Sequence, residues 1–343
     1  MEPLQLRSPD VAALSDWLAA EDDRPLLVET SGSTGAPKRV LLSRDAVKAS
    51  AQASARRLGA TGPWLLALPV SYVAGVQVLV RSLLAGHRPT LLDEHPSVAA
   101  AVAAMPAGDR FVSLVPTQLG RLLDDPDEAA ALATCHTVLL GGGPIDPALR
   151  ERAAAAGIRV VATYGAAETA GGCVYDGLPL DGVGVALGDD GRIRIAGPIL
   201  FHGYDGDPGS TAAHLVDGWY LTADAGRFDL DGRLQVLGRL DDMLISGGVK
   251  VPAPVVARLL RGHPSITDVE VVGVADGEWG QRVVALVVPA GTPPTLAQIR
   301  DFVADEHPRS WAPRELVVLD RLPLLGNGKV DRQALLALAS AAR

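Results

Sequence analysis

The first half of the chain alternates short apolar runs with longer segments that have helical periodicity. Residues 24–30 (RPLLVET) and 39–43 (RVLLS) are apolar runs of the length typical of buried strands. Ser43 predicts the N-cap of a helix that continues through Arg57, because a serine hydroxyl can accept a bond from a free backbone N–H at a helix start. The pattern therefore predicts two strands joined by a polar loop and followed by a helix.

The clearest local unit lies in residues 137–163. An apolar strand ends at Leu140, a glycine-rich turn follows, and Asp146 with Pro147 predicts the start of a helix. Gly157 ends that helix, and a second strand follows to residue 163. This strand, helix and strand order predicts a parallel sheet.

An uncharged run at residues 58–80 is long enough to span a membrane. Prolines and polar residues interrupt it, and WLLALP is typical of a short buried strand that ends at a proline. A helix is expected after Tyr72. We interpret the run as buried core.

The pattern changes near Val183 to short strands separated by Gly/Asp turns, which predicts a small antiparallel or barrel-like subdomain. After residues 238–242, helix and strand alternate again. We place a domain boundary near Asp241, between a domain at 1–240 and one at 241–343. The predicted fold class is α/β, with a large mixed domain, a barrel-like subdomain and a small α/β C-terminal domain.

The composition of the chain argues against several classes of function. With 343 residues, 48% of them hydrophobic, the chain can bury a large core. Its net charge of -9 and the lack of a basic stripe argue against a nucleic-acid surface. Two cysteines, Cys135 and Cys173, are too few for a disulfide framework, and the start MEPLQLRSPD lacks the features of a signal peptide. We therefore expect a cytoplasmic protein.

The loop TSGSTGAPK (residues 30–38) combines hydroxyls, glycines and a lysine. It is no Walker A loop, because a strand follows Lys38 and the required Gly-Lys-Ser/Thr order is missing. Its N–H groups, hydroxyls and lysine can converge on phosphate oxygens. A solvated hairpin tip is the alternative. The candidate phosphate-binding residues are Thr30, Ser31, Gly32, Ser33, Thr34, Gly35 and Lys38.

Four later segments carry further candidate chemistry. Tyr164 can stack on a base and Glu168 can take a hard cation such as Mg²⁺. Asp224 and Arg239 are candidate partners for ribose hydroxyls or a phosphate, and Lys329 lies in a Gly-rich turn near the C-terminus. Each residue taken singly also has an ordinary structural interpretation.

In their order along the chain these motifs resemble the adenylate-forming enzymes, the superfamily of acyl-CoA synthetases and adenylation domains. The resemblance covers residues 27–332. It rests on the motifs TSGSTGAPK, GGGP, YGAAE, GPILFHGY, GWYLTAD, GRLDDMLISGG and GNGK. It implies an AMP-forming acid–thiol ligase that uses ATP, Mg²⁺ and CoA, with a mobile C-terminal domain that turns about a hinge.

The same resemblance implies roles for individual residues. Lys329 and Glu168 would be catalytic, Glu168 would also bind the metal, and Asp241 would be the hinge. The further nucleotide-binding or CoA-binding candidates are Gly141, Gly142, Gly143, Tyr164, Gly165, Asp224, Arg239, Gly247 and Gly248.

Residues 68–86 narrow the resemblance, because they are similar to the equivalent segment of the o-succinylbenzoate–CoA ligases of menaquinone biosynthesis. The resemblance implies that Arg81 faces the carboxylates of the aromatic acid and that Tyr72 lies at the acyl pocket. Arg81 is the only charge between Arg57 and Arg88, which suits a substrate with a second carboxylate. A helix-surface arginine without a ligand is the alternative. The resemblance to short ligases of this type also implies that much of the usual N-terminal subdomain is absent, so that the phosphate loop comes early.

The chain departs from the family pattern at several positions. Ala167 replaces the usual Thr before the metal-binding Glu, and Ala223 replaces a Gly. The segment that contains Lys250, a candidate CoA contact, lacks the Glu that is common in the wider family. The alternatives left open are a ligase for another carboxylic acid, transfer to a carrier protein in place of CoA, and a nucleotide-binding module without catalysis. The sequence also leaves open whether a homodimer completes the core.

Overall fold

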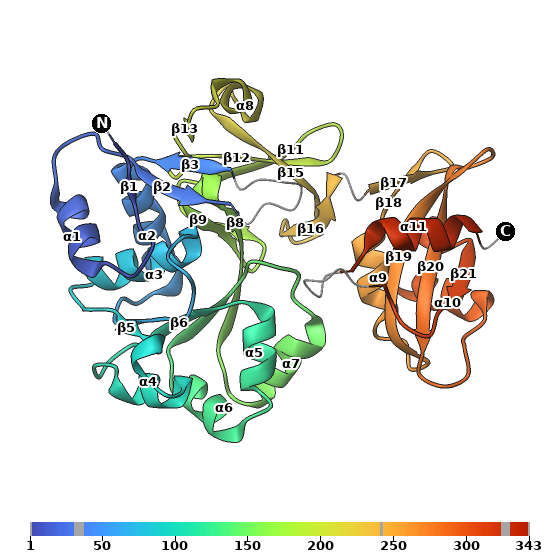
Figure 1. Ribbon diagram of the computed structural model, residues 1–343, viewed down its shortest axis with the longest axis horizontal. Helices are drawn as coiled ribbons and strands as arrows, with labels where there is room; N and C mark the ends of the chain where they lie inside the picture. Colours follow the sequence, from blue (N-terminus) through green and yellow to red (C-terminus); the bar gives the residue numbers. More distant parts are fainter. Residues whose placement is uncertain (1, 31–37, 241–242, 324–329, 342–343) are drawn as a thin grey trace. The chain divides into compact units, whose positions relative to one another are not determined.

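The computed structural model describes residues 2–30, 38–240, 243–323 and 330–341. The chain divides into two compact units, of which the first contains residues 1–188, 193–222 and 228–235 and the second contains 189–192, 223–227 and 236–343. Figure 1 shows the elements of both units along the chain. Within the described residues no helix combines the length and the apolar character that a bilayer span requires.

A seven-stranded sheet forms the centre of the first unit, in the order β10-β9-β8-β7-β6-β4-β5. The strands β4, β5, β6, β7 and β8 run parallel, whereas β9 pairs antiparallel with β8 and β10 pairs antiparallel with β9. The strand bounds are β4 (Trp64–Leu66), β5 (Thr90–Leu91), β6 (Phe111–Leu114), β7 (Thr137–Leu140), β8 (Val160–Ala166), β9 (Gly171–Tyr175) and β10 (Leu178–Pro179). The predicted parallel sheet is confirmed.

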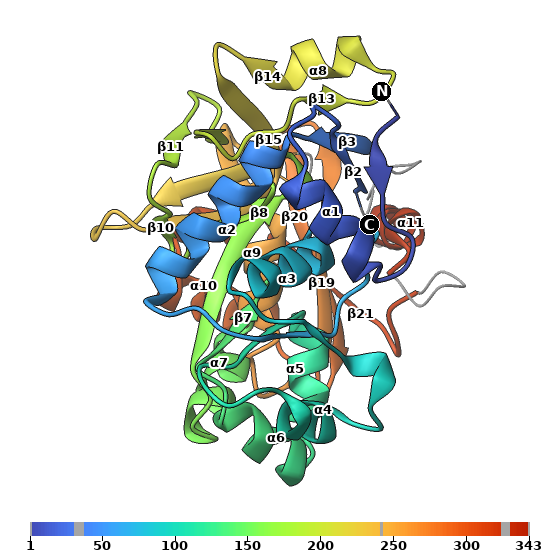
Figure 2. The same ribbon diagram turned by 90° about the vertical axis from the view of Figure 1, so that its left-hand side faces the viewer.

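Helices cover both faces of this sheet. Successive strand residues point to opposite faces, so Leu65 and Val112 belong to the core under one set of helices, while Trp64 stacks on Phe111 at 4.8 Å on the other face. The first set is α4 (Val98–Ala104), α5 (Pro116–Leu122), α6 (Pro126–Ala133) and α7 (Pro147–Ala155), preceded by the short helix η1 (Leu92–Glu94). The other set is α2 (Arg44–Leu58) and α3 (Val73–Leu84), which Figure 2 shows side by side.

The predicted helix starts agree with the structure. The Ser43 side chain caps α2 by accepting a bond from the Ala46 N–H, and the left-handed Gly59 ends the helix. Asp146 caps α7 in the same way, with Pro147 as its first residue. The uncharged run at residues 58–80 supplies β4 and most of α3, as expected for core.

Two smaller sheets complete the elements before residue 240. The first has the order β1-β2-β3-β13, and the second has β11-β12-β15-β14 with β16 paired to β15. The bounds are β1 (Leu4–Gln5), β2 (Leu26–Glu29), β3 (Arg39–Leu42), β13 (Gly203–Tyr204), β11 (Gly184–Leu187), β12 (Arg192–Ala196), β14 (Leu215–Val216), β15 (Trp219–Phe228) and β16 (Leu234–Arg239). The short helices η2 (Ala167–Thr169) and α8 (Pro208–His214) belong to the first unit.

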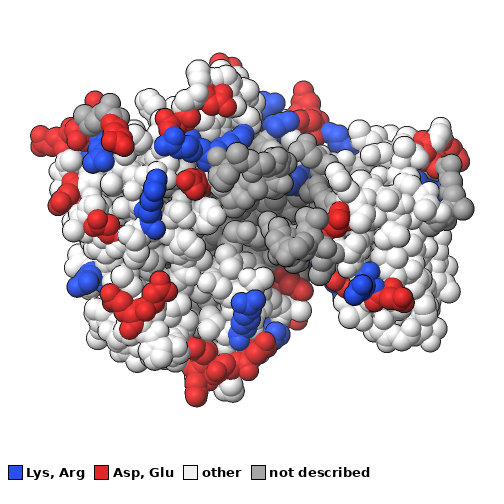
Figure 3. All heavy atoms as spheres, in the orientation of Figure 1, with Lys and Arg blue, Asp and Glu red and all other residues white. Residues whose placement is uncertain are grey.

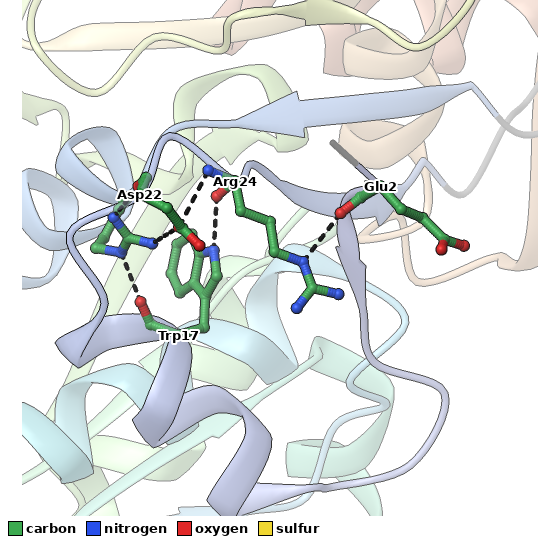
Figure 4. A network of polar contacts seen from close by, with 5 residues as sticks. Glu2, Trp17, Asp22 and Arg24 are labelled. Atoms are coloured by element: carbon green, nitrogen blue, oxygen red, sulfur yellow. Dashed lines mark hydrogen bonds and ion pairs between the residues drawn. The ribbon is translucent and has the colours of Figure 1, made fainter.

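A polar network joins the start of the chain to α1 (Val11–Ala19) and α2, as Figure 4 shows. The indole N–H of Trp17 donates to the Arg24 carbonyl at 2.8 Å, and Arg24 Nε donates to the Glu2 carbonyl at 2.9 Å. Arg44 on α2 forms an ion pair with Asp22 at 2.8 Å. The hydrogen bond from Arg44 is the main reason why the pKa of Asp22 lies below its usual value.

The second unit contains a five-stranded sheet in the order β18-β17-β20-β19, with β21 paired to β20. Alternate residues of β19 and β20 face two cores: Val271 and Ala285 pack with α9 and α10, while Val272 and Val284 pack with α11. The bounds are β17 (Met243–Ser246), β18 (Val249–Pro252), α9 (Ala253–Leu260), β19 (Ile266–Asp276), β20 (Gly280–Pro289), α10 (Leu296–Glu306), η4 (Arg309–Trp311), β21 (Glu315–Val318) and α11 (Arg332–Ala341). The alternation of helix and strand after residue 242 is therefore as predicted.

Both cysteines are free and buried. Burial raises the pKa of the Cys135 thiol to about 11 and that of Cys173 to about 12. On the face of the molecule in Figure 3, basic and acidic side chains of the described residues are interspersed.

Candidate functional site

The ends of the Thr30 to Lys38 loop are held together. β2 and β3 pair antiparallel up to Glu29 and Arg39. Beyond that pair, the Thr30 N–H donates to the Lys38 carbonyl and the Lys38 N–H donates to Thr30 Oγ1, each at 3.0 Å. Residues 31–35, predicted to bind phosphate, lie outside the described residues. The structure therefore defines the base of the loop, with the Thr30 hydroxyl already engaged there.

Glu168 lies on η2, directly after the end of β8, and is only 5% exposed. The hydroxyl of Tyr204 donates to Glu168 Oε1 at 2.7 Å. Burial first, and the neighbouring Glu168 charge second, raise the pKa of Tyr204 far above its usual value, so this hydroxyl stays a donor at neutral pH.

Tyr204 also connects Glu168 to the phosphate loop. It lies on β13, which pairs with β3 so that Tyr204 is opposite Val40. The Lys38 ammonium lies 4.8 Å from the centre of the Tyr204 ring, within the range of a cation–π contact. Three predicted residues, Thr30, Lys38 and Glu168, thus belong to one continuous set of contacts. Tyr204 was not predicted as a site residue, although it ends the motif GPILFHGY on which the resemblance rests.

The predicted glycines lie where β7 and β8 end. Gly141 follows β7, and a Cβ atom there would lie 2.3 Å from Thr163 Oγ1. A Cβ on Gly165 would lie 2.1 Å from the Gly171 carbonyl oxygen. These two glycines therefore permit close packing of β7, β8 and β9. Gly142 and Gly143 are exposed at the same carboxyl end of the parallel strands, where ligands of open α/β sheets bind. Tyr164, predicted at a strand end, lies within β8, because β9 pairs with β8 as far as Ala166.

The two predicted acyl-binding residues lie at opposite ends of α3 and differ in exposure. Tyr72 is the N-cap residue and is 40% exposed. Arg81 is in the last turn and only 8% exposed, with its guanidinium 5.1 Å from the centre of the Trp64 ring. Its Nη2 donates to the Tyr175 hydroxyl at 3.3 Å, whereas its buried Nε has no hydrogen-bond partner within the described residues. The alternative of an exposed surface arginine is wrong.

The other predicted residues belong to the second unit. Arg239 Nη1 lies 3.9 Å from Asp224 Oδ1, so the two candidate ribose or phosphate ligands are neighbours. Gly247 and Gly248 form the two-residue turn of the β17–β18 hairpin, with φ of 59° and 77° that suit glycine. The Lys250 ammonium donates to the Asp190 carbonyl at 2.6 Å. Asp241 and Lys329, the predicted hinge and catalytic lysine, lie outside the described residues.

Comparisons with known proteins agree with these features. A family model described as AMP-binding enzyme matches residues 15–205, and one described as the AMP-binding enzyme C-terminal domain matches residues 256–329. A Mycobacterium tuberculosis protein named "Probable 2-succinylbenzoate–CoA ligase" is 46% identical over 325 residues, which span 92% of this chain and 84% of that protein.

Solved structures give the same result. The o-succinylbenzoate CoA synthetase from Bacillus subtilis, in complex with the acyl-adenylate intermediate OSB-AMP, is similar with a TM-score of 0.75 and 29% identity, over 90% of this chain and 68% of that one. The same Bacillus subtilis enzyme in complex with ATP and magnesium ion has a TM-score of 0.73 and 28% identity, over 90% and 69% of the two chains. The predicted resemblance and α/β fold class are confirmed, and the chain belongs to the AMP-binding enzymes, in the family of the 2-succinylbenzoate–CoA ligases.

Proposed function

We propose that this chain joins 2-succinylbenzoate to coenzyme A in two steps. One carboxylate of the acid attacks the α-phosphorus of ATP, which forms an acyl-adenylate and releases pyrophosphate. The CoA thiol then attacks the acyl carbon, and AMP and a proton leave. The named relatives support this reaction, since one of them is described in complex with an acyl-adenylate intermediate.

The observation that carries the substrate assignment is the burial of Arg81. An arginine is always charged at neutral pH, and burying a charge without a counter-charge is unfavourable by several kcal/mol. No Asp or Glu of the described residues forms an ion pair with Arg81. An anionic ligand would offset that penalty. 2-Succinylbenzoate has two carboxylates, so one can react while the other remains an anion for Arg81.

The loop base and Glu168 would act on the nucleotide. Mg²⁺ is usually held by one or two carboxylates together with substrate phosphates, and a single buried carboxylate that keeps one oxygen for a metal fits this description. Bound there, the ion would neutralise phosphate charge that otherwise repels the incoming carboxylate. The Lys38 ammonium and the N–H groups of the Thr30 to Lys38 loop would contact the phosphates, which fixes the direction of attack.

Residues of the second unit complete the proposal. Asp224 and Arg239 would contact the ribose or a phosphate, and the Gly247–Gly248 turn would take part in the thioester step. Lys329 would stabilise the charge that develops at the α-phosphorus, and removal of such a group lowers rates on the order of 10²- to 10³-fold. A rotation about Asp241 would exchange these two groups between the steps.

The experiment is to incubate the purified protein with ATP, Mg²⁺, CoA and 2-succinylbenzoate, and to measure AMP and thioester by mass spectrometry. Benzoate and octanoate serve as parallel acids. We expect AMP and thioester with 2-succinylbenzoate, and a large loss in Arg81→Met but not in Arg88→Met, the same change at an exposed arginine nearby. AMP with another acid only would refute the substrate assignment. No AMP with any acid would favour a nucleotide-binding module without catalysis.

A further inference from the structure

A buried polar cluster lies between α2, α3 and β9, and we name its members Ser54, Tyr175 and Arg81 the Tyr175 cluster. The Tyr175 hydroxyl lies 2.8 Å from Ser54 Oγ and 3.3 Å from Arg81 Nη2. Ser54 is fully buried and Tyr175 is 2% exposed. The hydroxyl therefore meets one side chain from each helix in a region closed to bulk water.

The direction of the hydrogen bond between Arg81 and Tyr175 follows from the chemistry of the two groups. A guanidinium has N–H donors and no acceptor, so the Tyr175 oxygen must accept from Arg81. The Tyr175 hydroxyl keeps its single proton, which it can donate to Ser54 Oγ at 2.8 Å. Ser54 thus holds the Tyr175 hydroxyl next to Arg81.

A second set of contacts, one helical turn before Arg81, fixes the position of α3. Gln77, four residues before Arg81, donates from Nε2 to the Ala170 carbonyl at 2.8 Å and to the Val47 carbonyl at 3.2 Å. Gly171 faces Gln77, and a Cβ atom at Gly171 would lie 3.2 Å from Gln77 Cγ. Because φ of Gly171 is 106°, glycine is the residue that suits this contact. The backbone of α3 is therefore held against α2 and β9, and the Arg81 side chain starts from a defined place.

The guanidinium of Arg81 has protein partners at some of its atoms only. One side of it meets the Trp64 ring, and Nη2 is taken by Tyr175. Its Nε has no hydrogen-bond partner within the described residues, although it is buried. Of the guanidinium nitrogens only Nη2 forms a hydrogen bond within the described residues, so the guanidinium keeps N–H donors for a ligand carboxylate.

We propose that Tyr175, held by Ser54, is a positioning residue that fixes the Arg81 guanidinium so that its remaining N–H groups bind the non-reacting carboxylate of the substrate. This inference rests on the proposed function. It makes Tyr175 a determinant of specificity for an acid with two carboxylates. Tyr175 itself need not touch the substrate.

The test compares two acids that differ in the second carboxylate. 2-Succinylbenzoate carries it, and 4-oxo-4-phenylbutanoate has the same reacting chain without it. For Tyr175→Phe we expect KM for 2-succinylbenzoate to rise about tenfold, which corresponds to about 1.4 kcal/mol, because the guanidinium loses the hydrogen bond that positions it. KM for ATP and kcat/KM for the phenyl acid should change less than about twofold. Ser54→Ala should act in the same direction with a smaller effect, and it serves as a second variant if Tyr175→Phe folds poorly.

A double-mutant cycle separates positioning from general damage. In the Arg81→Met background, Tyr175→Phe should have no further effect on KM for 2-succinylbenzoate, because the group that it positions is gone. Additive effects, or equal increases of KM for both acids and ATP, would overturn the positioning role while the proposed function stands. A wild-type protein that makes no thioester from 2-succinylbenzoate would refute the proposed function and this inference with it.

Discussion

The Tyr204 hydroxyl donates to Glu168 Oε1 at 2.7 Å, although the two residues are far apart in the chain and both are buried. Tyr204 is placed by β13 and Glu168 by the turn after β8. The hydrogen bond occupies one carboxylate oxygen and thereby sets the orientation of the other. Since Glu168 is the proposed metal ligand, Tyr204 would control how well that ligand is oriented.

Tyr204→Phe should weaken the apparent Mg²⁺ affinity in AMP formation about tenfold, because loss of a hydrogen bond to a metal ligand typically lowers metal affinity 10- to 100-fold. The measurement is a Mg²⁺ titration of AMP release, together with calorimetric binding of ATP with and without Mg²⁺. In the Glu168→Gln background, Tyr204→Phe should have no further effect on Mg²⁺ dependence. A further effect there would mean that Tyr204 acts by another route.

Arg81→Met should make the protein more stable while it strongly lowers kcat/KM for 2-succinylbenzoate. A buried charge is replaced by an apolar chain of similar length, and Tyr175 keeps its bond to Ser54. We expect a gain of about 1 kcal/mol in the free energy of unfolding, as replacement of buried ionic groups by apolar ones often gives. Thermal melts with and without the acid check this: the acid should raise Tm of the wild type only. A lower Tm of Arg81→Met without ligand would contradict the stability argument.

Thr30→Val should raise KM for ATP about fivefold. The change removes the acceptor of the Lys38 N–H at the loop base, and a neutral hydrogen bond contributes about 1 kcal/mol. Thr30→Ser keeps the hydroxyl and is the matched control. Initial rates at varied ATP measure the effect, and equal KM values for all three proteins would argue against a role for the loop base.

His307 should make the second unit sensitive to mild acid. Its pKa lies below the ordinary value of 6.5, first because of burial and then because of the nearby Arg227, with a smaller opposing influence from Glu306. Protons therefore bind the unfolded state more tightly than the folded state. Stability is fully present above pH 6.5 and falls as the pH drops from there towards the folded pKa. Urea titrations between pH 8 and pH 5 should show a smaller loss for His307→Gln than for the wild type; equal losses would assign the acid sensitivity to other groups.

Lys329→Ala should abolish ATP–pyrophosphate exchange and leave thioester formation from supplied acyl-adenylate largely intact. The reason is that the proposed role of Lys329 belongs to the first step alone. The two half-reactions are measured separately on one preparation. Equal loss of both would contradict the assignment of Lys329 and the proposed rotation about Asp241.

Local rules predicted much of the fold because local interactions determine it. Ser43 and Asp146 cap their helices through contacts within three residues, and these starts agree with the structure. β6, with the four residues Phe111–Leu114, gave no distinct signal, because such a short buried strand is specified by its neighbours β4 and β7.

Interactions of the site are different, since they join residues that are distant in the chain. The sequence indicated that Arg81 is exceptional, because it is the only charge in a long uncharged stretch. It gave no indication of Tyr175, whose hydroxyl reaches Arg81 from 94 residues away. The sequence likewise gave no indication of Tyr204, because only the pairing of β13 with β3 brings it to Lys38.

The burial of Cys135 and Cys173 has a practical consequence for kinetics. Thiol reagents such as aromatic disulfides react with thiolates, and thiols with pKa values of about 11 and about 12 supply almost none at neutral pH. The folded protein should therefore not react with such a reagent, and the colour that the reagent releases would measure free coenzyme A alone. Timed samples treated with the reagent could then follow thioester formation without a protein background, and a slow rise in colour from the protein itself would report unfolding.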